Sequence, residues 1–197
     1  MRLSVCIVNW NTRDYLRECL TSLYEFPPQG ADLEVLVVDN ASRDGSVAMV
    51  TEEFPQALLV ANADNKGYAE GNNQALEQAT GDLLLLLNPD VVVYDGSLTR
   101  AVEFMAAHPD AGAMGCRLIG GDGETQRSVR GFPDPSPVLW ESAGLSRLFP
   151  RSKTFGAYRM TYFGYDQEAE VDQPMGSFLL ITRAALDKVG LMDPASR

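Results

Sequence analysis

The sequence predicts an α/β fold with a mostly parallel central sheet and helices on both faces. Three observations support this. Short apolar strands alternate with helical segments through the first 118 residues. The strands are continuously apolar rather than alternating in polarity, which indicates burial on both faces of a sheet. Polar clusters follow four successive strands, and ligands of such sheets bind at the carboxyl ends of the strands.

The expected elements of the first half follow one another regularly. The first helix has Leu16, Leu20 and Leu23 at helical spacing, with Asn11 or Thr12 as its N-cap. Gly81 is a stop signal behind a later helix. Strands are expected at residues 3–8, 33–38, 57–61, 82–87 and 111–118, helices at 12–26, 45–54, 67–79 and 97–107, and a loop at 62–66.

The second half has shorter apolar runs and more proline. A helix is expected over residues 138–149, with Leu139, Trp140, Leu145 and Leu148 buried. Residues 150–174 mix aromatic and charged residues, and we expect a mobile surface loop there. The other expectations are a turn at 120–123, a strand at 124–130, a proline-rich loop at 131–137, a strand at 178–182 and a helix at 183–189.

Composition and charge exclude several classes of protein. The chain has 27 acidic and 16 basic residues, a net charge of −11, which argues against nonspecific nucleic-acid binding. No apolar run approaches the roughly 18–20 residues that span a bilayer. The N-terminus lacks a signal-peptide pattern, which favours the cytoplasm. Cys6, Cys19 and Cys116 have no metal-site spacing, so we expect reduced, mostly buried thiols.

Amides and carboxylates follow four expected strands, and parallel strands bring them to one edge. No glycine-rich dinucleotide fingerprint follows the first strand, where the turn is Asn9-Trp10-Asn11, and no P-loop occurs. A divalent metal held by a carboxylate is then the candidate for neutralising a bound diphosphate. The strand-end residues are Asn9 and Asn11; Asp39, Asn40 and Ser42; Asn62, Asp64 and Asn65; and Asn88 and Asp90.

Four motifs in order carry a family resemblance. They are VCIVNWN, VVDNASRDGS, NADNKGYAEGNNQAL and GDLLLLLNPDVVV, followed by QRSVRGFP and MGSFLLITRAALDKVGLMD. In this order and spacing they resemble the inverting family 2 glycosyltransferases with the GT-A fold, closest to the bacterial rhamnosyltransferase-like branch. The resemblance implies one GT-A domain, with a nucleotide-binding half at residues 1–118 and an acceptor-side half at 119–197 that is incomplete at its C-terminus.

The resemblance also implies which residues bind the nucleotide. Asp39 would hydrogen-bond the base, and the edge of the first strand would lie alongside base and ribose. A loop and helix start would close over the nucleotide. The implied contacts besides Asp39 are Val8, Asn9 and Asn11 on the first strand, and Asn65, Gly67 and Asn72 or Asn73 on the loop and helix.

The metal site is implied at the end of the fourth strand. Asp90 matches the last aspartate of the family's DxD motif, which ligates Mg²⁺ or Mn²⁺ on the diphosphate. Asn88 stands in place of the first carboxylate, where it would offer a neutral oxygen or bond the sugar. One formal charge would then remain at the metal.

The resemblance places the general base outside this chain. Family members continue after a GLMD-like segment with a Glu-Asp motif whose aspartate deprotonates the acceptor. The sequence ends at Arg197 before such a motif, so we expect the base beyond Arg197. Because a general base contributes about 10²–10⁴-fold, we expect these residues to bind sugar nucleotide but to transfer sugar poorly.

The expected function is metal-assisted sugar transfer with inversion. The donor would be a nucleotide-diphosphate sugar, with dTDP-rhamnose as a candidate, and the acceptor a glycan or lipid-linked sugar of cell wall polysaccharide biosynthesis. That acceptor is compatible with a cytoplasmic protein associated peripherally with the inner face of the membrane. The alternatives are a non-catalytic nucleotide-sugar-binding module and a nucleotidyltransferase, although the glycine- and basic-rich loop of the latter is absent after the first strand.

Purely structural explanations exist for the same residues. The Asp39–Ser42 stretch could be an Asx turn, and the amides from Asn65 to Asn73 could be helix-start chemistry. Gly67 and Gly71 weaken that second explanation, because glycine lowers helix stability. Asp193 is expected to be a structural or acceptor-side residue.

Overall fold

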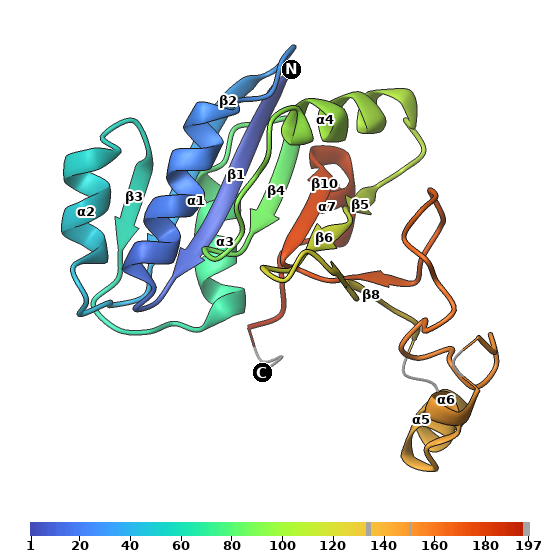
Figure 1. Cartoon of the computed structure of the whole chain (residues 1–197). Coiled ribbons are helices and arrows are strands. Elements are labelled where there is room, and N and C mark those ends of the chain that lie inside the picture. The colour runs from blue at the N-terminus through green and yellow to red at the C-terminus, as the bar shows by residue number, and fades with distance from the viewer. Residues whose placement is uncertain (133–134, 150, 195–197) are drawn as a thin grey trace. The chain divides into compact units, whose positions relative to one another are not determined.

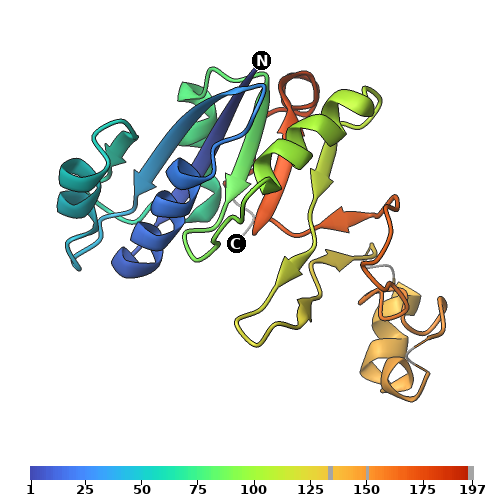
Figure 2. The same ribbon diagram turned by 45° about the horizontal axis from the view of Figure 1, so that its top comes forward.

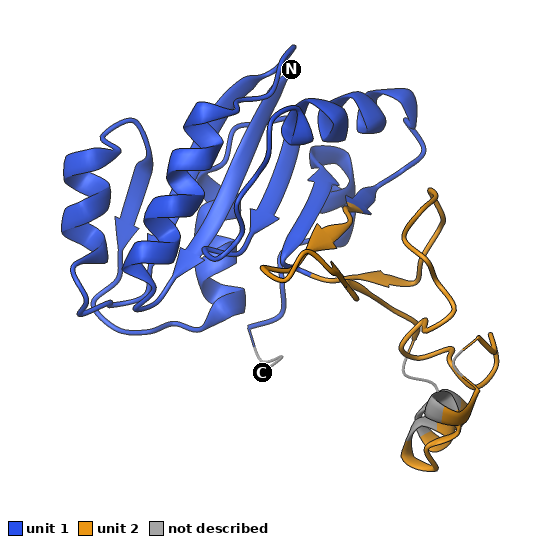
Figure 3. Ribbon diagram, viewed as in Figure 1, with its two compact units in different colours: residues 1–114, 176–197 blue, residues 115–175 orange. Residues whose placement is uncertain are grey.

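The structure is a computed structural model that describes residues 1–132, 135–149 and 151–194. The chain forms two compact units (Figure 3). Unit 1 is Met1–Met114 with Gly176–Arg197, and unit 2 is Gly115–Met175. The expected division at residue 118 concerns binding roles and stays a prediction.

Unit 1 alternates strands and helices as the sequence predicted (Figure 1), and most bounds differ from the expected ones by only one or two residues. Its elements are β1 (Arg2–Asn9), α1 (Arg13–Glu25), β2 (Asp32–Asp39), α2 (Ser46–Glu53), β3 (Leu58–Ala61), α3 (Tyr68–Gln78), β4 (Leu83–Leu87), α4 (Ser97–Ala107), β5 (Ala113–Gly115), β10 (Phe178–Thr182) and α7 (Arg183–Val189).

The central sheet has the strand order β3-β2-β1-β4-β10-β5. The first four strands in the chain run parallel, and β10 runs antiparallel to β4. The register places Asn9 opposite Asp39 and Asp39 opposite Ala61. The carboxyl ends of β1, β2 and β3 therefore align at one edge, which confirms the expected mostly parallel sheet.

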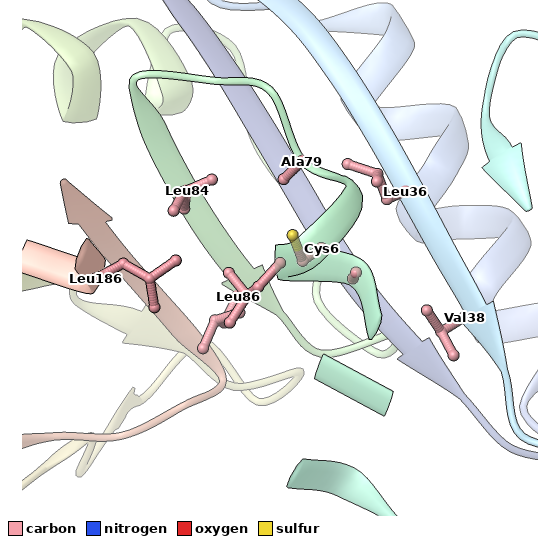
Figure 4. Packing of buried hydrophobic residues seen from close by; sticks show 9 residues of the cluster. Cys6, Leu36, Val38, Ala79, Leu84, Leu86 and Leu186 are labelled. Carbon is pink, nitrogen blue, oxygen red and sulfur yellow. The ribbon is translucent and has the colours of Figure 1, made fainter. Parts of the chain in front are cut away.

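Helices cover both faces of this sheet (Figures 1 and 2). Leu84 and Leu86 of β4 pack with residues of α3 and α7 on one face (Figure 4). Side chains alternate along a strand, so Leu83, Leu85 and Leu87 point to the face of α1 and α4. All five leucines are buried, and each contributes roughly 1.5–3 kcal/mol to folding. The first face is formed by Cys6, Leu36, Val38, Ala75, Leu76, Ala79, Leu84, Leu86 and Leu186.

Unit 2 departs from the expected elements. The strands expected at residues 111–118 and 124–130 are each broken in two. Residues 151–172 form turns and bends, as expected for a loop, and their mobility stays a prediction. The elements are β6 (Leu118–Ile119) paired with β7 (Thr125–Gln126), β8 (Val129–Arg130) paired with β9 (Gln173–Pro174), and the helices α5 (Pro135–Ser142) and α6 (Leu145–Leu148).

The prediction of one helix over residues 138–149 is wrong in the bounds of the helix and in the burial of two of its leucines. Helix α5 begins at Pro135, inside the expected loop, because proline suits the first turn of a helix. Gly144 has φ +72° and separates α5 from α6, a conformation that glycine adopts readily. Leu139 and Leu148, expected in the core, are 59% and 71% exposed. None of the helices within the described ranges is long and apolar enough to cross a membrane.

Candidate functional site

The Asp39 carboxylate lies at the carboxyl end of β2 and is only 1% exposed. Its Oδ2 accepts a hydrogen bond from Asn9 Nδ2 at 2.7 Å, and its Oδ1 accepts one from the Ser42 backbone N–H at 2.8 Å. The second bond is the expected local turn chemistry. An ionised carboxylate has about four acceptor sites, so Asp39 keeps acceptor capacity for a ligand donor.

The turns after β1 and β2 are locked to each other. Asn11 donates its backbone N–H to Ser42 Oγ at 2.8 Å, and its Oδ1 accepts from the Arg43 N–H at 2.8 Å. Asn11 and Ala41 have φ values of +54° and +60°, the left-handed region that costs most residues energy. Sequence reasoning missed this strain, because it depends on two turns that meet only in the folded chain.

Thr12 is the N-cap of α1, as expected, but its hydroxyl does not cap the helix. It donates to Asn9 Oδ1 at 2.6 Å. The Arg13 N–H at the start of the helix is bonded instead by Asp44 Oδ2 at 2.8 Å. Thr12 thus orients the Asn9 amide so that its nitrogen faces Asp39.

Asn40 connects the ends of β2 and β3 to the start of α3. Its Nδ2 donates to the Gly67 carbonyl at 3.0 Å, and its Oδ1 accepts from Asn62 Nδ2 at 3.0 Å. Asn62 also donates to Gln74 Oε1 at 2.8 Å. The sequence predicted that Asn40 and Asn62 lie at this edge but assigned them no role. In the structure their hydrogen bonds support the loop before α3.

The loop before α3 combines helix-start chemistry with close packing. Asn65 Oδ1 accepts from the Gly67 N–H at 2.8 Å, and both residues are exposed. Gly71 lies against β1, where an added Cβ would come within 2.8 Å of Val8 Cγ1. The close approach inferred for the glycines is therefore to the protein's own strand at Gly71, while Gly67 faces open space.

Asn72 and Asn73 are both buried in α3 but bond differently. Asn72 Nδ2 donates to the Tyr68 carbonyl at 2.9 Å. Asn73 pairs with the backbone of Met192, donating from Nδ2 at 2.8 Å and accepting at Oδ1 at 2.9 Å. The sequence left open whether Asn72 or Asn73 contacts the nucleotide. Both the nitrogen and the oxygen of the Asn73 amide bond to the segment after α7.

The turn Asn88-Pro89-Asp90 ends β4. The Asn88 N–H donates to the Ser177 carbonyl at 3.1 Å, which joins this turn to the segment before β10. Asp90 is exposed, and no residue within the described ranges donates a hydrogen bond to its carboxylate. Cys19 lies behind the turn; burial and then the charge of Asp90 raise its pKa to about 12. Cys19 is therefore a buried, neutral thiol.

The donor set at this edge suits a metal that arrives with its substrate. Among the described residues, no group of three or more His, Cys, Asp or Glu side chains could hold a metal ion. Mg²⁺ commonly takes one or two carboxylates and completes its shell with water and substrate phosphates. Asp90, with the neutral Asn88 beside it, fits that arrangement and not an all-protein cage.

A surface pocket of about 840 Å³ adjoins the start of α3. Tyr68 forms part of its wall, and the Tyr68 hydroxyl donates to the Gly176 carbonyl at 3.3 Å. An added Cβ on Gly176 would lie 2.9 Å from that hydroxyl. The volume is in the range of small-molecule sites. Its lining residues are Asn65, Lys66, Gly67, Tyr68, Ala69, Glu70, Met192, Asp193 and Pro194.

These features define an α/β domain with a polar edge at the carboxyl ends of its parallel strands, the place where ligands of such sheets generally bind. The sequence pattern of Glycosyl transferase family 2 matches residues 4–169. The chain belongs to this family, which confirms the resemblance seen in its motifs.

Relatives in the same family are longer than this chain. It is 27% identical over 202 residues to N-acetylglucosaminyl-diphospho-decaprenol L-rhamnosyltransferase of Mycobacterium tuberculosis, covering 97% of this chain and 64% of the relative. It is 32% identical over 111 residues to the uncharacterized glycosyltransferase YfnE of Bacillus subtilis, covering 55% and 26%. The chain thus spans less than two thirds of these relatives.

Solved structures share the architecture. A mannosyltransferase of Pyrobaculum calidifontis, in complex with GDP-Man and Mn²⁺, superposes with a TM-score of 0.64 at 24% identity, covering 98% of this chain and 48% of that one. TarS of Staphylococcus aureus superposes with a TM-score of 0.65 at 19% identity, covering 99% and 51%. At these identities the likeness shows the fold, and it confirms the expected GT-A architecture.

Proposed function

We propose that this chain is the donor-binding part of a glycosyltransferase that transfers a sugar from a nucleotide-diphosphate sugar, with inversion and metal assistance. The observation that carries the proposal is the position of Asp39 and Asp90 at one edge of the sheet in a family 2 chain. β2 and β4 flank β1, so their ends lie about 10 Å apart, which is two strand spacings. An extended nucleoside diphosphate can bridge that distance.

Each carboxylate would have one task. Asp39, oriented by Asn9 and the Ser42 N–H, would accept a hydrogen bond from the base. Asp90 would hold Mg²⁺ or Mn²⁺, which when bound neutralises charge on the departing diphosphate. Val8 and Asn11 would border base and ribose, Asn65, Gly67 and Asn72 would close the loop over the nucleotide, and Asn88 would bond the sugar or the metal.

The finer assignments rest on the relatives. The rhamnosyltransferase of M. tuberculosis, named for an N-acetylglucosaminyl-diphospho-decaprenol acceptor, supports dTDP-rhamnose as a candidate donor and a lipid-linked acceptor. A role in cell wall polysaccharide biosynthesis at the inner face of the membrane follows from such an acceptor.

The metal assignment is tested by calorimetry of dTDP and UDP binding, with and without Mn²⁺. Asp90→Asn removes the charge but little volume. A neutral amide then replaces the carboxylate that a hard divalent metal prefers, so the affinity gained with Mn²⁺ should fall about tenfold or more. Binding without metal should stay within about twofold. Asp110→Asn, an exposed aspartate in the turn after α4, is the matched control. An unchanged Mn²⁺ effect in Asp90→Asn would show that the metal binds elsewhere.

Product analysis separates the rival classes. A glycosyltransferase releases dTDP or UDP from the sugar nucleotide, whereas a nucleotidyltransferase makes sugar nucleotide and pyrophosphate from a nucleoside triphosphate. A binding module would show nucleotide binding with no product in either assay, even in a protein extended beyond Arg197. Pyrophosphate release would replace the proposal with the second class.

A further inference from the structure

Large apolar side chains are exposed on the helix pair of unit 2. Leu139 on α5 is 59% exposed, Leu148 at the end of α6 is 71% exposed and Phe149 is 52% exposed. Arg151 and Lys153 follow directly and are also exposed. We call these five residues the hairpin surface; α5 and α6 lie side by side (Figures 1 and 2).

The aromatic cluster of the helix pair is formed by Trp140, Phe149 and Phe155, so Leu139 and Leu148 lie outside it. Trp140 of α5 packs edge-on against Phe155, with ring centroids 5.6 Å apart, and Phe149 packs against the same ring at 5.5 Å. This aromatic cluster joins α5, α6 and the following segment. Single exposed leucines are ordinary, but Leu148 and Phe149 are consecutive, and Leu139 is exposed on the helix packed against α6. A group of this kind marks an interaction surface.

The charge of this region is opposite to that of the rest of the protein. Residues 127–159 contain six basic and two acidic residues, a net charge of +4. The remaining residues contain 10 basic and 25 acidic residues, a net charge of −15. An anionic surface would therefore repel most of the chain and attract this region alone, which also carries the exposed apolar side chains.

We propose that the hairpin surface docks on an anionic phospholipid bilayer. Leu139, Leu148 and Phe149 would enter the boundary between headgroups and acyl chains, and Arg151 and Lys153 would contact the headgroup phosphates. Binding of this kind combines apolar insertion with attraction to anionic lipid. The proposal does not depend on the donor or metal assignments, because it uses no residue of the sheet edge.

Sedimentation with vesicles tests the proposal on the 197-residue chain. Wild-type protein should bind vesicles of phosphatidylcholine with phosphatidylglycerol, and should bind pure phosphatidylcholine far less. Each Lys or Arg near an anionic surface is worth about 1 kcal/mol, or about fivefold. The double variant Arg151→Gln with Lys153→Gln should therefore bind about 30-fold more weakly. Leu148→Ser should lower binding about tenfold.

Matched controls come from unit 1. Val189→Ser changes an apolar side chain that is 78% exposed on α7, and Arg100→Gln changes an exposed arginine on α4. Both should bind anionic vesicles within about twofold of wild type. Circular dichroism and nucleotide affinity should be unchanged in every variant, so that loss of folding is recognised.

Three results would overturn the proposal. The first is wild-type protein that stays in solution with anionic vesicles. The second is binding that the hairpin variants and the unit 1 controls weaken equally. The third is a dimer in the absence of lipid that Leu148→Ser dissociates, which would assign the surface to a second copy of the chain. Nucleotide binding would be unaffected in all three cases, so the donor-site proposal would stand or fall separately.

Discussion

Among single residues, the side-chain amides at the sheet edge bond mostly to the protein itself. Asn65 accepts from the Gly67 N–H, Asn72 donates to the Tyr68 carbonyl, and Asn73 pairs with Met192 through both amide atoms. An asparagine amide can hydrogen-bond either a ligand or the protein's own backbone, and the sequence does not show which of the two partners it bonds. Met192 is 119 positions away from Asn73, and only folding brings them together.

Replacing Asn73 tests whether its amide serves structure or ligand. Asn73→Ala removes two hydrogen bonds and leaves the N–H and carbonyl of Met192 without this partner, so the free energy of unfolding should fall by about 1–3 kcal/mol. Hydrogen exchange at the Met192 amide should accelerate, while dTDP affinity changes by less than about threefold. Urea denaturation, exchange mass spectrometry and calorimetry measure these quantities.

A control on the same helix is available. Gln78→Ala removes an exposed amide whose Nε2 bonds only within α3, to the Gln74 carbonyl, and it should change stability by less than about 0.5 kcal/mol. If Asn73→Ala lowers nucleotide affinity strongly while exchange at Met192 is unaltered, Asn73 contacts the nucleotide directly.

Between elements, the packing of α3 against β1 sets the position of the loop that is proposed to cover the nucleotide. Gly71 permits this approach, because an added Cβ would lie 2.8 Å from Val8 Cγ1 and 3.3 Å from Asn40 Nδ2. Asn40 in turn bonds the Gly67 carbonyl. A shift of α3 away from β1 would therefore move the loop as well.

Gly71→Ala sets two effects against each other. Alanine favours a helix over glycine by about 1 kcal/mol, whereas overpacking a core contact costs about 1–3 kcal/mol. We expect the second to prevail, with a lower midpoint of urea denaturation and weaker dTDP binding. Gly121→Ala, where an added Cβ meets nothing within 4 Å, should leave both unchanged. A stabilised Gly71→Ala protein would show that β1 and α3 separate easily.

Element boundaries were predictable in unit 1 and poorly predictable in unit 2 for a physical reason. β4 and its neighbours are long apolar runs covered on both faces, so their own pattern specifies them. In the described part of unit 2, strands β6, β7, β8 and β9 have two residues each. Such short strands are defined by their pairing partners, such as Val129 with Pro174, and these are distant in sequence.

At the scale of the whole molecule, apolar burial is concentrated in unit 1. Among the described residues of unit 2, Val129 and Met160 are the buried hydrophobic side chains, whereas unit 1 buries the leucines of β4, α1 and α4. Regions with few buried apolar contacts open at lower free energy than the core. The two units should therefore differ in local stability.

Limited proteolysis with trypsin checks this expectation. The first cuts should fall between Arg127 and Arg159, where six basic residues occur, before any cut at the arginines of α1 or α4. Mass spectrometry of early fragments identifies the sites. Vesicles with anionic lipid should slow cutting at Arg151 and Lys153 if the hairpin surface docks there. Early cuts at Arg2 or Lys66 instead would contradict the assigned difference in stability.

The sequence by itself determined the α/β class, the family and the edge of the sheet at which the polar side chains gather. These conclusions rest on local features that can be read directly from one sequence: continuous apolar strands, the order of the motifs and the polar residues after each strand. Tertiary structure alone decided the partners. It pairs Asn9 with Asp39, bonds Asn73 to Met192, holds Asn11 at positive φ with a hydrogen bond to Ser42, and leaves Leu148 exposed. Those outcomes depend on contacts between segments far apart in the chain, which no local pattern encodes.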